Sequence, residues 1–414
     1  MNSQLSLQNQ LVPVVDEYRY LGFPFNRTLN AATAISSRVA AVTPAINALA
    51  AFNKNRRHPL VAKLALLRNV ALPKIVYGGE VFGMQITHIK PLESAFGKCL
   101  GNVCLPWGRP AAVTLRRELG LASIHATTSC LRARASIKYP TLLTHVAPLT
   151  RLHAEDGEEL KTTSTHWTKA TRNWIKKRLD IHAATAAQLE AAATARDSSL
   201  YARIVRDRID EAEWDTLIND QSDNNRGAKW YNAHSFLTSR SFIKTYISMN
   251  KFDADLDRGV AGLIACRTYG VWTGDRAARR GMIDACYKTR CPCCDCDDFP
   301  EPETFDHLLL RCPAWTAQRN KYLRNLLGFI AIRAPGLSAI DTVAVLLGGV
   351  ASTGFTLGVC WYTKASRSAS ALPLFIRVAR FLSSILSPRL SLLWRSSTSR
   401  GPAEDMAALG GTEA

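Results

Sequence analysis

The sequence predicts a mostly α-helical fold that begins with a short strand or hairpin and carries a small cysteine-rich module. Apolar residues recur at three- and four-residue intervals over much of the chain, which is the spacing of an amphipathic helix. One early stretch, residues 12–25, instead gathers β-branched and aromatic residues around Gly22 and Pro24, which is typical of a strand or hairpin. Five cysteines and one histidine lie between residues 291 and 312. With 414 residues, 47% of them hydrophobic, the chain is long enough for two or three domains.

Helices are predicted to follow the hairpin in order. The first two have apolar residues at helical spacing over 35–49 and 60–70, on either side of a basic turn, and Pro73 ends the second. Further helical patterns lie at residues 92–104, 115–119, 131–143, 183–195, 313–327 and 372–386. The segment NDQSDNNRG, residues 219–227, has the composition of a loop at a domain boundary. The residues from 396 onward have the composition of a disordered tail.

Cysteine usage depends on the compartment. The first residues, MNSQLSLQNQLVPVV, lack the basic and apolar regions of a secretory signal, and no run of about 18 uninterrupted apolar residues occurs. We therefore expect a soluble, intracellular protein. Because disulfides are rare in a reducing compartment, the eleven cysteines are predicted to be thiols or metal ligands. Six of them have apolar neighbours and are interpreted as core residues: Cys99, Cys104, Cys130, Cys266, Cys286 and Cys360.

The segment CPCCDCDDFPEPETFDHLLLRCP, residues 291–313, has the spacing of a zinc site. Cys291 and Cys294 form a C-x2-C turn, and His307 and Cys312 follow on a helical run. Together they supply the tetrahedral nitrogen and sulfur donors that Zn2+ prefers, and such a closed site is structural because it keeps no position for water or substrate. The same C-x2-C spacing recurs two residues further along the chain, so the sequence leaves the register open. The alternative pair is Cys293 and Cys296.

The charge balance predicts a polyanionic partner. Lys and Arg number 52 against 34 Asp and Glu, and residues 1–150 hold +12 of the net +18, with 17 Lys and Arg against 5 Asp and Glu. A membrane would attract the same charge, but the basic segments lack a strongly amphipathic aromatic face, so nucleic acid is the preferred partner. Neither a membrane nor a small-molecule substrate is expected. The candidate phosphate contacts are Lys54, Arg56, Arg57, Arg116 and Arg117.

Five segments carry a family resemblance. In chain order they are YRYLGFPF at residues 18–25, LLRNVALPKIVYGGEVFG at 66–83, RRELGLASI at 116–124, CPCC with ETFDHLLLRCP in the cysteine-rich segment, and RVARFLSSIL at 377–386. Together they resemble the carboxy-terminal part of a non-LTR retrotransposon reverse transcriptase. They are similar to the strand that enters the thumb, the thumb helix, the start of the connecting region, the zinc-binding knuckle and the terminal helix of that family. Residues 150–260 match nothing in it.

The resemblance implies an organisation and a role. Residues 1–110 would form a thumb-like helical region, 111–225 a helical connector, 226–395 the zinc knuckle region with its terminal helix, and 396–414 a disordered tail. In the family such parts grip template RNA and an RNA/DNA duplex with low sequence specificity, and the expected location is the nucleus. The resemblance also implies which residues hold the structural Zn2+, and it leaves Cys293 and Cys296 as extra cysteines. The implied ligands are Cys291, Cys294, His307 and Cys312.

Polymerase activity is not expected of this chain. The family's catalytic site needs an aromatic-Ala-Asp-Asp turn to hold two metal ions, and the resemblance places that turn before the first residue of this sequence. The only adjacent aspartates, Asp297 and Asp298, lie in the cysteine-rich segment. Two other classes stay open. One is a zinc-containing interaction or scaffold protein, and the other is a fragment of an active RNA-directed DNA polymerase whose palm is encoded upstream.

Overall fold

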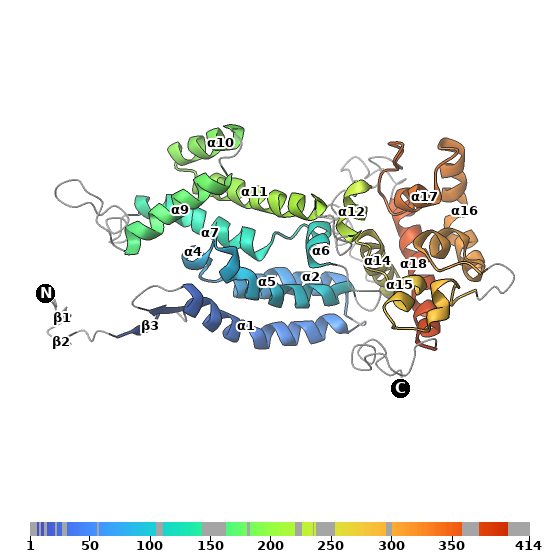
Figure 1. The fold of residues 1–414 in the computed structure, drawn as a ribbon, viewed down its shortest axis with the longest axis horizontal. Coiled ribbons are helices and arrows are strands. Elements are labelled where there is room, and N and C mark those ends of the chain that lie inside the picture. The colour runs from blue at the N-terminus through green and yellow to red at the C-terminus, as the bar shows by residue number, and fades with distance from the viewer. Residues whose placement is uncertain are drawn as a thin grey trace. The chain divides into compact units, whose positions relative to one another are not determined.

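The structure, a computed structural model, confirms the mostly α-helical fold (Figure 1). It describes residues 6–7, 10–11, 15–20, 23–26, 31–55, 58–104, 111–142, 163–179, 183–219, 226–234, 236, 253–294, 300–357 and 372–395. The chain forms two compact units, and three stretches of sequence contribute to each. Unit 1 comprises Met1–Ile46, Ala71–Phe96 and Ala122–Glu213, and unit 2 comprises Asn47–Val70, Gly97–Leu121 and Trp214–Ala414. The four segments implied by the family resemblance stay a prediction.

The strands in the described part of the chain form two short antiparallel hairpins. Strand β1 (Ser6–Leu7) pairs with β2 (Gln10–Leu11), and β3 (Glu17–Tyr20) pairs with β4 (Phe23–Asn26). In the second hairpin Tyr18 lies opposite Phe25, an aromatic pair of the kind that stabilises strand pairing. The hairpin predicted near the N-terminus is therefore confirmed.

The helices of unit 1 pack around an apolar core. They are α1 (Ala31–Lys54), α3 (Leu72–Val76), α4 (Gly79–Phe82), α5 (Ile86–Gly101), α7 (Ile124–Lys138), η3 (Tyr139–Thr141), α9 (Thr163–Leu179), α10 (Ala183–Thr194) and α11 (Ser198–Asn219); α1, α5 and α11 end in residues of unit 2. The core takes Ala133 from α7, Ile175 from α9, Leu189 from α10 and Val205 from α11. On α11 the core residues Tyr201, Val205 and Ile209 recur every four residues, so that helix turns one face inward.

Helix α7 is the centre of unit 1. Ser123 caps its first turn, since the Ser123 hydroxyl accepts a hydrogen bond from the Ala126 backbone N–H at 2.8 Å. Arg132 points inward, donating to the Thr171 hydroxyl at 2.8 Å and to the Gly83 carbonyl at 3.0 Å. Burial lowers the pKa of Arg132 to about 10. Gly83 allows α7 to approach closely, because an added Cβ there would lie 2.3 Å from the Thr128 carbonyl oxygen.

One helix of the described chain meets the length and composition of a membrane span. The segment Ile35–Lys54 of α1 has a mean hydropathy of 1.3. It also contains Arg38, whose guanidinium donates to the Lys74 carbonyl at 2.9 Å. A single such helix is weak evidence, because core helices of soluble proteins pass the same test.

The helices of unit 2 carry the cysteine-rich segment. They are α2 (Leu60–Leu66), η1 (Leu67–Ala71), η2 (Asn102–Cys104), α6 (Ala112–Leu119), α12 (Arg226–Ala233), α14 (Ala254–Arg267), α15 (Gly274–Arg279), η5 (Ala285–Lys288), η6 (His307–Arg311), η7 (Pro313–Trp315), α16 (Thr316–Arg333), α17 (Ala339–Leu346) and α18 (Leu372–Arg395). Helix α14 packs against α18, and their backbones almost touch at Gly259. A Cβ added at Gly259 would lie 1.9 Å from the Ala379 carbonyl oxygen, so no larger residue fits this crossing.

Buried polar contacts also join the helices of unit 2. Arg267 on α14 forms an ion pair of 2.7 Å with Glu118 on α6, and both side chains are almost fully buried. The hydroxyl of Tyr231 on α12 donates to the same carboxylate at 2.7 Å. A buried carboxylate must be paired with a cation and must accept hydrogen bonds. These contacts therefore specify how α6, α12 and α14 pack together.

Candidate metal centre

Two short segments of unit 2 bring the four predicted ligands together. Cys291 and Cys294 lie in the turn that follows η5, whereas His307 opens the π-helical turn η6 and Cys312 follows its last residue. The Cys312 backbone N–H donates to the His307 carbonyl at 2.7 Å, the i to i+5 hydrogen bond of a π turn. This bond widens the turn and places both side chains on the same side as the two cysteines.

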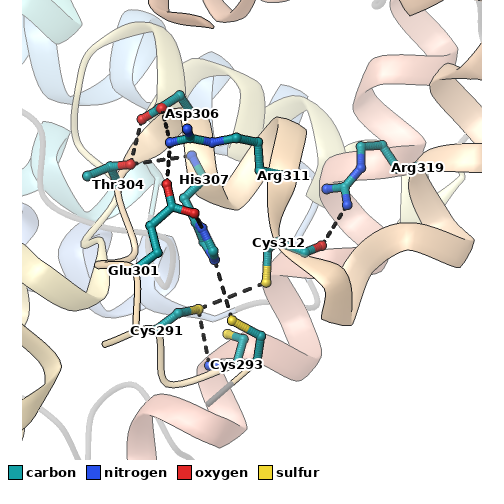
Figure 2. A network of polar contacts seen from close by, with 10 residues as sticks. Cys291, Cys293, Glu301, Thr304, Asp306, His307, Arg311, Cys312 and Arg319 are labelled. Carbon is teal, nitrogen blue, oxygen red and sulfur yellow. Dashed lines mark hydrogen bonds and ion pairs between the residues drawn. The ribbon is translucent and has the colours of Figure 1, made fainter. Parts of the chain in front are cut away.

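The four donor atoms have the spacing of a tetrahedral metal site (Figure 2). All four lie within 4.8 Å of one another. The Cys291 and Cys312 sulfurs are 3.9 Å apart, and the Cys294 sulfur is 3.6 Å from Nε2 of His307. A tetrahedral ion with bonds of about 2.3 Å to sulfur and about 2.05 Å to nitrogen requires a sulfur–sulfur separation of about 3.8 Å and a sulfur–nitrogen separation of about 3.6 Å. The cluster can therefore hold a metal ion.

The surroundings of the cluster favour negative charge on one sulfur, that of Cys291. Cys291 and Cys312 are buried, Cys294 is half-buried, and His307 is 2% exposed. Hydrogen bonds from Cys293 and Cys312 lower the pKa of Cys291, despite the opposing effect of burial, whereas the hydrogen bond with Cys291 and burial raise the pKa of Cys312. Burial acts to lower the pKa of His307, but its hydrogen bonds with Cys291 and Glu301 outweigh burial and raise it. A bound cation would supply the positive charge that the thiolate attracts.

A second layer of polar residues orients the imidazole. Oε2 of Glu301 lies 2.8 Å from Nδ1 of His307, so Nδ1–H donates to the carboxylate and Nε2 is directed at the sulfurs (Figure 2). Arg311 in turn pairs with Glu301 and with Asp306, each at 2.5 Å. On the other side, Arg319 of α16 donates to the Cys312 carbonyl at 2.6 Å. Both the histidine and the last cysteine are thus held from outside the cluster.

Cys293 has different contacts from the four clustered donors. Its thiol donates to Oε1 of Glu303 at 3.4 Å. Glu303 also lies close enough to Cys291 and Cys293 to complete a second possible metal group. However, Arg389 of α18 donates to both Glu303 oxygens, at 2.7 and 2.6 Å, so a cation already occupies that carboxylate. Cys296, the other member of the alternative pair, lies outside the described residues.

The residues predicted to contact phosphate differ in their exposure to solvent. Lys54 is exposed at the end of α1, and Arg117 is exposed with its guanidinium carbon 4.4 Å from the centre of the Trp214 ring. Arg116 is only 5% exposed, so its guanidinium cannot reach a phosphate without opening the fold, and it drops out of the candidate set. The remaining two, Arg56 and Arg57, lie outside the described residues.

The scattered cysteines are only partly core residues. Cys99 and Cys266 are buried, and burial raises the pKa of Cys99 to about 11 and that of Cys266 to about 12, so both are neutral thiols. Cys130 is half-buried. The core interpretation is wrong for Cys286, which is exposed on the short turn η5. The side chain of Cys104 and the whole of Cys360 lie outside what the structure describes.

Sequence reasoning missed the residues that support the cluster. Glu301 lies six positions before His307, and glutamates flanked by prolines read as an ordinary polar loop. The contact of Arg389 with Glu303 leaves no pattern in the sequence, because the two residues are 86 positions apart. Compared with family models, curated proteins and solved structures, the chain matches none. The molecule is thus a helical protein with a Cys3His cluster that can hold a metal ion.

Proposed function

We propose that the chain binds RNA or an RNA/DNA duplex with low sequence specificity, and that it is a non-catalytic relative of non-LTR retrotransposon reverse transcriptases. The observation that carries the proposal is the assembly of Cys291, Cys294, His307 and Cys312, in the register that the family resemblance implies. The concentration of positive charge in residues 1–150 supplies the attraction to phosphate. The proposed place of action is the nucleus.

The proposed cofactor is a structural Zn2+. Three thiolates and one imidazole suit zinc, whereas magnesium and calcium prefer oxygen donors. Four protein donors fill a tetrahedral shell, so the ion would keep no position for substrate. Its effect is on folding, because an ion that binds only the folded cluster contributes its binding free energy to the stability of the surrounding segment.

The basic residues of the proposal act through phosphates. Lys54 and Arg117 are exposed, and Arg56 and Arg57 complete the set. Contacts to phosphate position a protein on nucleic acid without reading its sequence, which is why low specificity is expected. Stacking by Arg117 on Trp214 holds its guanidinium plane against an aromatic ring.

A salt titration of binding tests this proposal. The affinity of the full chain for labelled RNA and for an RNA/DNA duplex is measured by fluorescence anisotropy at several salt concentrations. The logarithm of affinity should fall linearly with the logarithm of salt, by about 0.7 to 0.9 per phosphate neutralised. Replacing Arg56 and Arg57 with alanine should flatten the slope by about one to two units and weaken all sequences alike.

The control variant removes two cations that already have carboxylate partners. Arg206 pairs with Asp207 at 2.8 Å, and Arg208 pairs with Glu211 at 2.9 Å. Replacing both arginines with alanine lowers the net charge equally and should change the slope little. A flat salt response of the wild-type chain would contradict the proposal.

An interaction or scaffold role is the second candidate. Three large apolar side chains are exposed along residues 329–340, namely Phe329 (48%), Ile332 (80%) and Ile340 (42%). Exposed apolar residues of this size are common at protein interfaces. A chain that binds zinc but shows no salt-dependent affinity for nucleic acid would favour this second role.

A further inference from the structure

Helix α16 of unit 2 (Figure 1) carries an aromatic ring that faces solvent. Phe329 and Ile332 lie within its last two turns, and Ile332 is 80% exposed. The aromatic residues closer to the metal cluster, Phe305 and Trp315, are buried. Phe329, at 48% exposed, is therefore the ring that this part of unit 2 presents most fully to a partner.

The exposed charges of α16 are all positive. No Asp or Glu occurs anywhere in residues 313–340. The carboxylate that follows, Asp341, is buried and accepts hydrogen bonds from the backbone N–H and the hydroxyl of Ser352, each at 2.7 Å. The surface of α16 therefore complements a partner that is anionic and also offers apolar contact area. Its exposed cations are Lys321, Arg324 and Arg333.

Two rings on one side of α16 each have a cation close by. The guanidinium carbon of Arg333 lies 5.7 Å from the centre of the Phe329 ring. The ammonium nitrogen of Lys321 lies 5.1 Å from the centre of the half-buried Tyr322 ring. Because seven residues are close to two helical turns, the two rings share a side of the helix and are about 10 Å apart along its axis. A stack of bases advances by about three nucleotides, at about 3.4 Å each, over the same length.

The opposite side of α16 is fixed in unit 2. Leu323 and Ile330 are buried there. Arg319 donates to the Cys312 carbonyl at 2.6 Å, which joins the first turns of the helix to the segment that holds the metal ligands. A helix held in this way presents its exposed ring in a constant direction, so a stacking partner has little ordering cost to overcome.

This pattern fits a nucleic-acid single strand better than a membrane or a protein. A helix that lies on a membrane exposes a long apolar face, but the exposed positions of α16 before Phe329 are polar, charged or small. The centre of a protein interface is depleted in charge, whereas here a cation lies close to each ring. Aromatic rings interleaved with cations are the usual means of binding an unpaired strand, because every base offers a face for stacking.

We propose that Phe329 is a stacking site for an unpaired base of an RNA single strand, and that the exposed cations of α16 contact its phosphates. Ile332 adds apolar contact area beside the ring. The inference rests on the proposed nucleic-acid binding. It adds a contact in unit 2 that discriminates a single strand from a duplex, which contacts to phosphate alone do not.

The experiment compares two ligands of the full chain by fluorescence anisotropy. One is a labelled oligouridine strand, which forms no secondary structure, and the other is an RNA/DNA duplex. Phe329→Ala should weaken binding of the single strand about 5- to 150-fold, the range for one stacked base. It should change the affinity for the duplex less than about twofold, because the bases of a duplex already stack on one another. Phe329→Trp keeps an aromatic face and should keep the wild-type affinity.

The matched control removes an exposed ring elsewhere in the chain. Tyr18 on β3 is 61% exposed, and strand β3 also carries the acidic residue Glu17. Tyr18→Ala should therefore leave the affinity for both ligands unchanged. Far-ultraviolet circular dichroism checks that every variant remains helical.

A charge variant separates stacking from attraction to phosphate. Lys321→Gln/Arg324→Gln/Arg333→Gln should flatten the salt slope for the single strand by about 2 units, at about 0.7 per phosphate. Phe329→Ala should weaken binding without changing that slope, because stacking on a ring releases no counterions.

Three results would overturn the inference. The first is an unchanged single-strand affinity in a folded Phe329→Ala variant, or equal weakening by Tyr18→Ala. The second is binding to vesicles rich in phosphatidylserine that depends on Phe329 while RNA binding does not. The third is self-association in analytical ultracentrifugation that Ile332→Gln abolishes with unchanged RNA affinity, because the surface would then join two copies of the chain.

The outcomes also distinguish this inference from the proposed function. Salt-dependent binding that persists with an unchanged single-strand affinity in Phe329→Ala removes the stacking site and keeps the nucleic-acid role. Absence of salt-dependent binding by the wild-type chain removes both.

Discussion

The buried ion pair between Glu303 and Arg389 connects the metal cluster with the terminal helix, and breaking it should be costly. Their side chains are 0% and 2% exposed, and Arg389 also donates to the Trp272 carbonyl. The Arg389→Met substitution keeps most of the hydrocarbon volume but leaves the Glu303 carboxylate buried without its cation. Removing one partner of a buried pair costs about 3 to 5 kcal/mol. Against a typical total of about 5 to 15 kcal/mol, that is a large share of the stability.

Urea unfolding of the zinc-loaded chain, followed by tryptophan fluorescence, measures this cost. With a slope of about 2 kcal/mol per molar urea, the unfolding midpoint of unit 2 should fall by about 2 M. The control is Arg380→Met on the same helix, since Arg380 pairs with Asp253 at the surface, where the two side chains are 51% and 39% exposed. Its loss should cost less than about 1 kcal/mol.

A double variant tests the cause of the loss. Glu303→Leu with Arg389→Met removes both charges, so the buried carboxylate that destabilises the single variant is gone, and most of the stability should return. The reasoning is refuted if Arg389→Met unfolds within about 1 kcal/mol of the wild type, or if the double variant is as unstable as the single one.

Three further predictions concern the metal, the pH dependence and catalysis. His307→Ala or Cys312→Ser should abolish stoichiometric zinc, measured by atomic absorption, whereas Cys296→Ser should retain it; equal loss would mean that the other register binds the metal. Asp253→Ala, which removes the cap of α14, should cost about 1 kcal/mol in urea unfolding at pH 7. Hydrogen bonds from the Leu256 and Asp255 backbones lower the pKa of Asp253. The stability difference between the wild type and Asp253→Ala should therefore persist above about pH 4 and vanish as the pH falls through the lowered pKa. A stability difference that grows in acid would contradict the capping role. Purified protein with primer, template, Mg2+ and nucleotides should give no extension above a buffer blank, and extension that persists through purification would contradict a non-catalytic chain.

The metal cluster could be predicted because its ligands are close in sequence. Cys291 and Cys312 are 21 residues apart, and the C-x2-C and H-x4-C spacings predict a metal site here, although they leave the alternative pair Cys293 and Cys296 open. The π turn that aligns His307 with Cys312 could not be predicted, since helical periodicity assumes a hydrogen bond to the fourth residue rather than the fifth. The Glu303–Arg389 pair depends on how distant helices pack, which no local pattern encodes.

The basic clusters show a different limit of sequence reasoning. Arg116 and Arg117 are adjacent in the chain and were predicted to act together, yet successive residues on a helix point about 100° apart. Helix α6 turns Arg116 into unit 2 and Arg117 toward solvent. A cluster of charges along the sequence therefore does not predict a cluster on the surface. Residues three and four positions apart are the ones that are neighbours on a helix surface.

The crossing of α14 and α18 at Gly259 has a consequence for how the chain is synthesised. Helix α14 leaves the ribosome more than a hundred residues before α18, although its buried face is completed by α18. Until α18 has been synthesised, the Gly259 face of α14 is therefore unpacked and exposes apolar surface that chaperones recognise. A messenger that stops before residue 372 would leave that face permanently open, and its product should aggregate or be degraded even though every metal ligand has already been made.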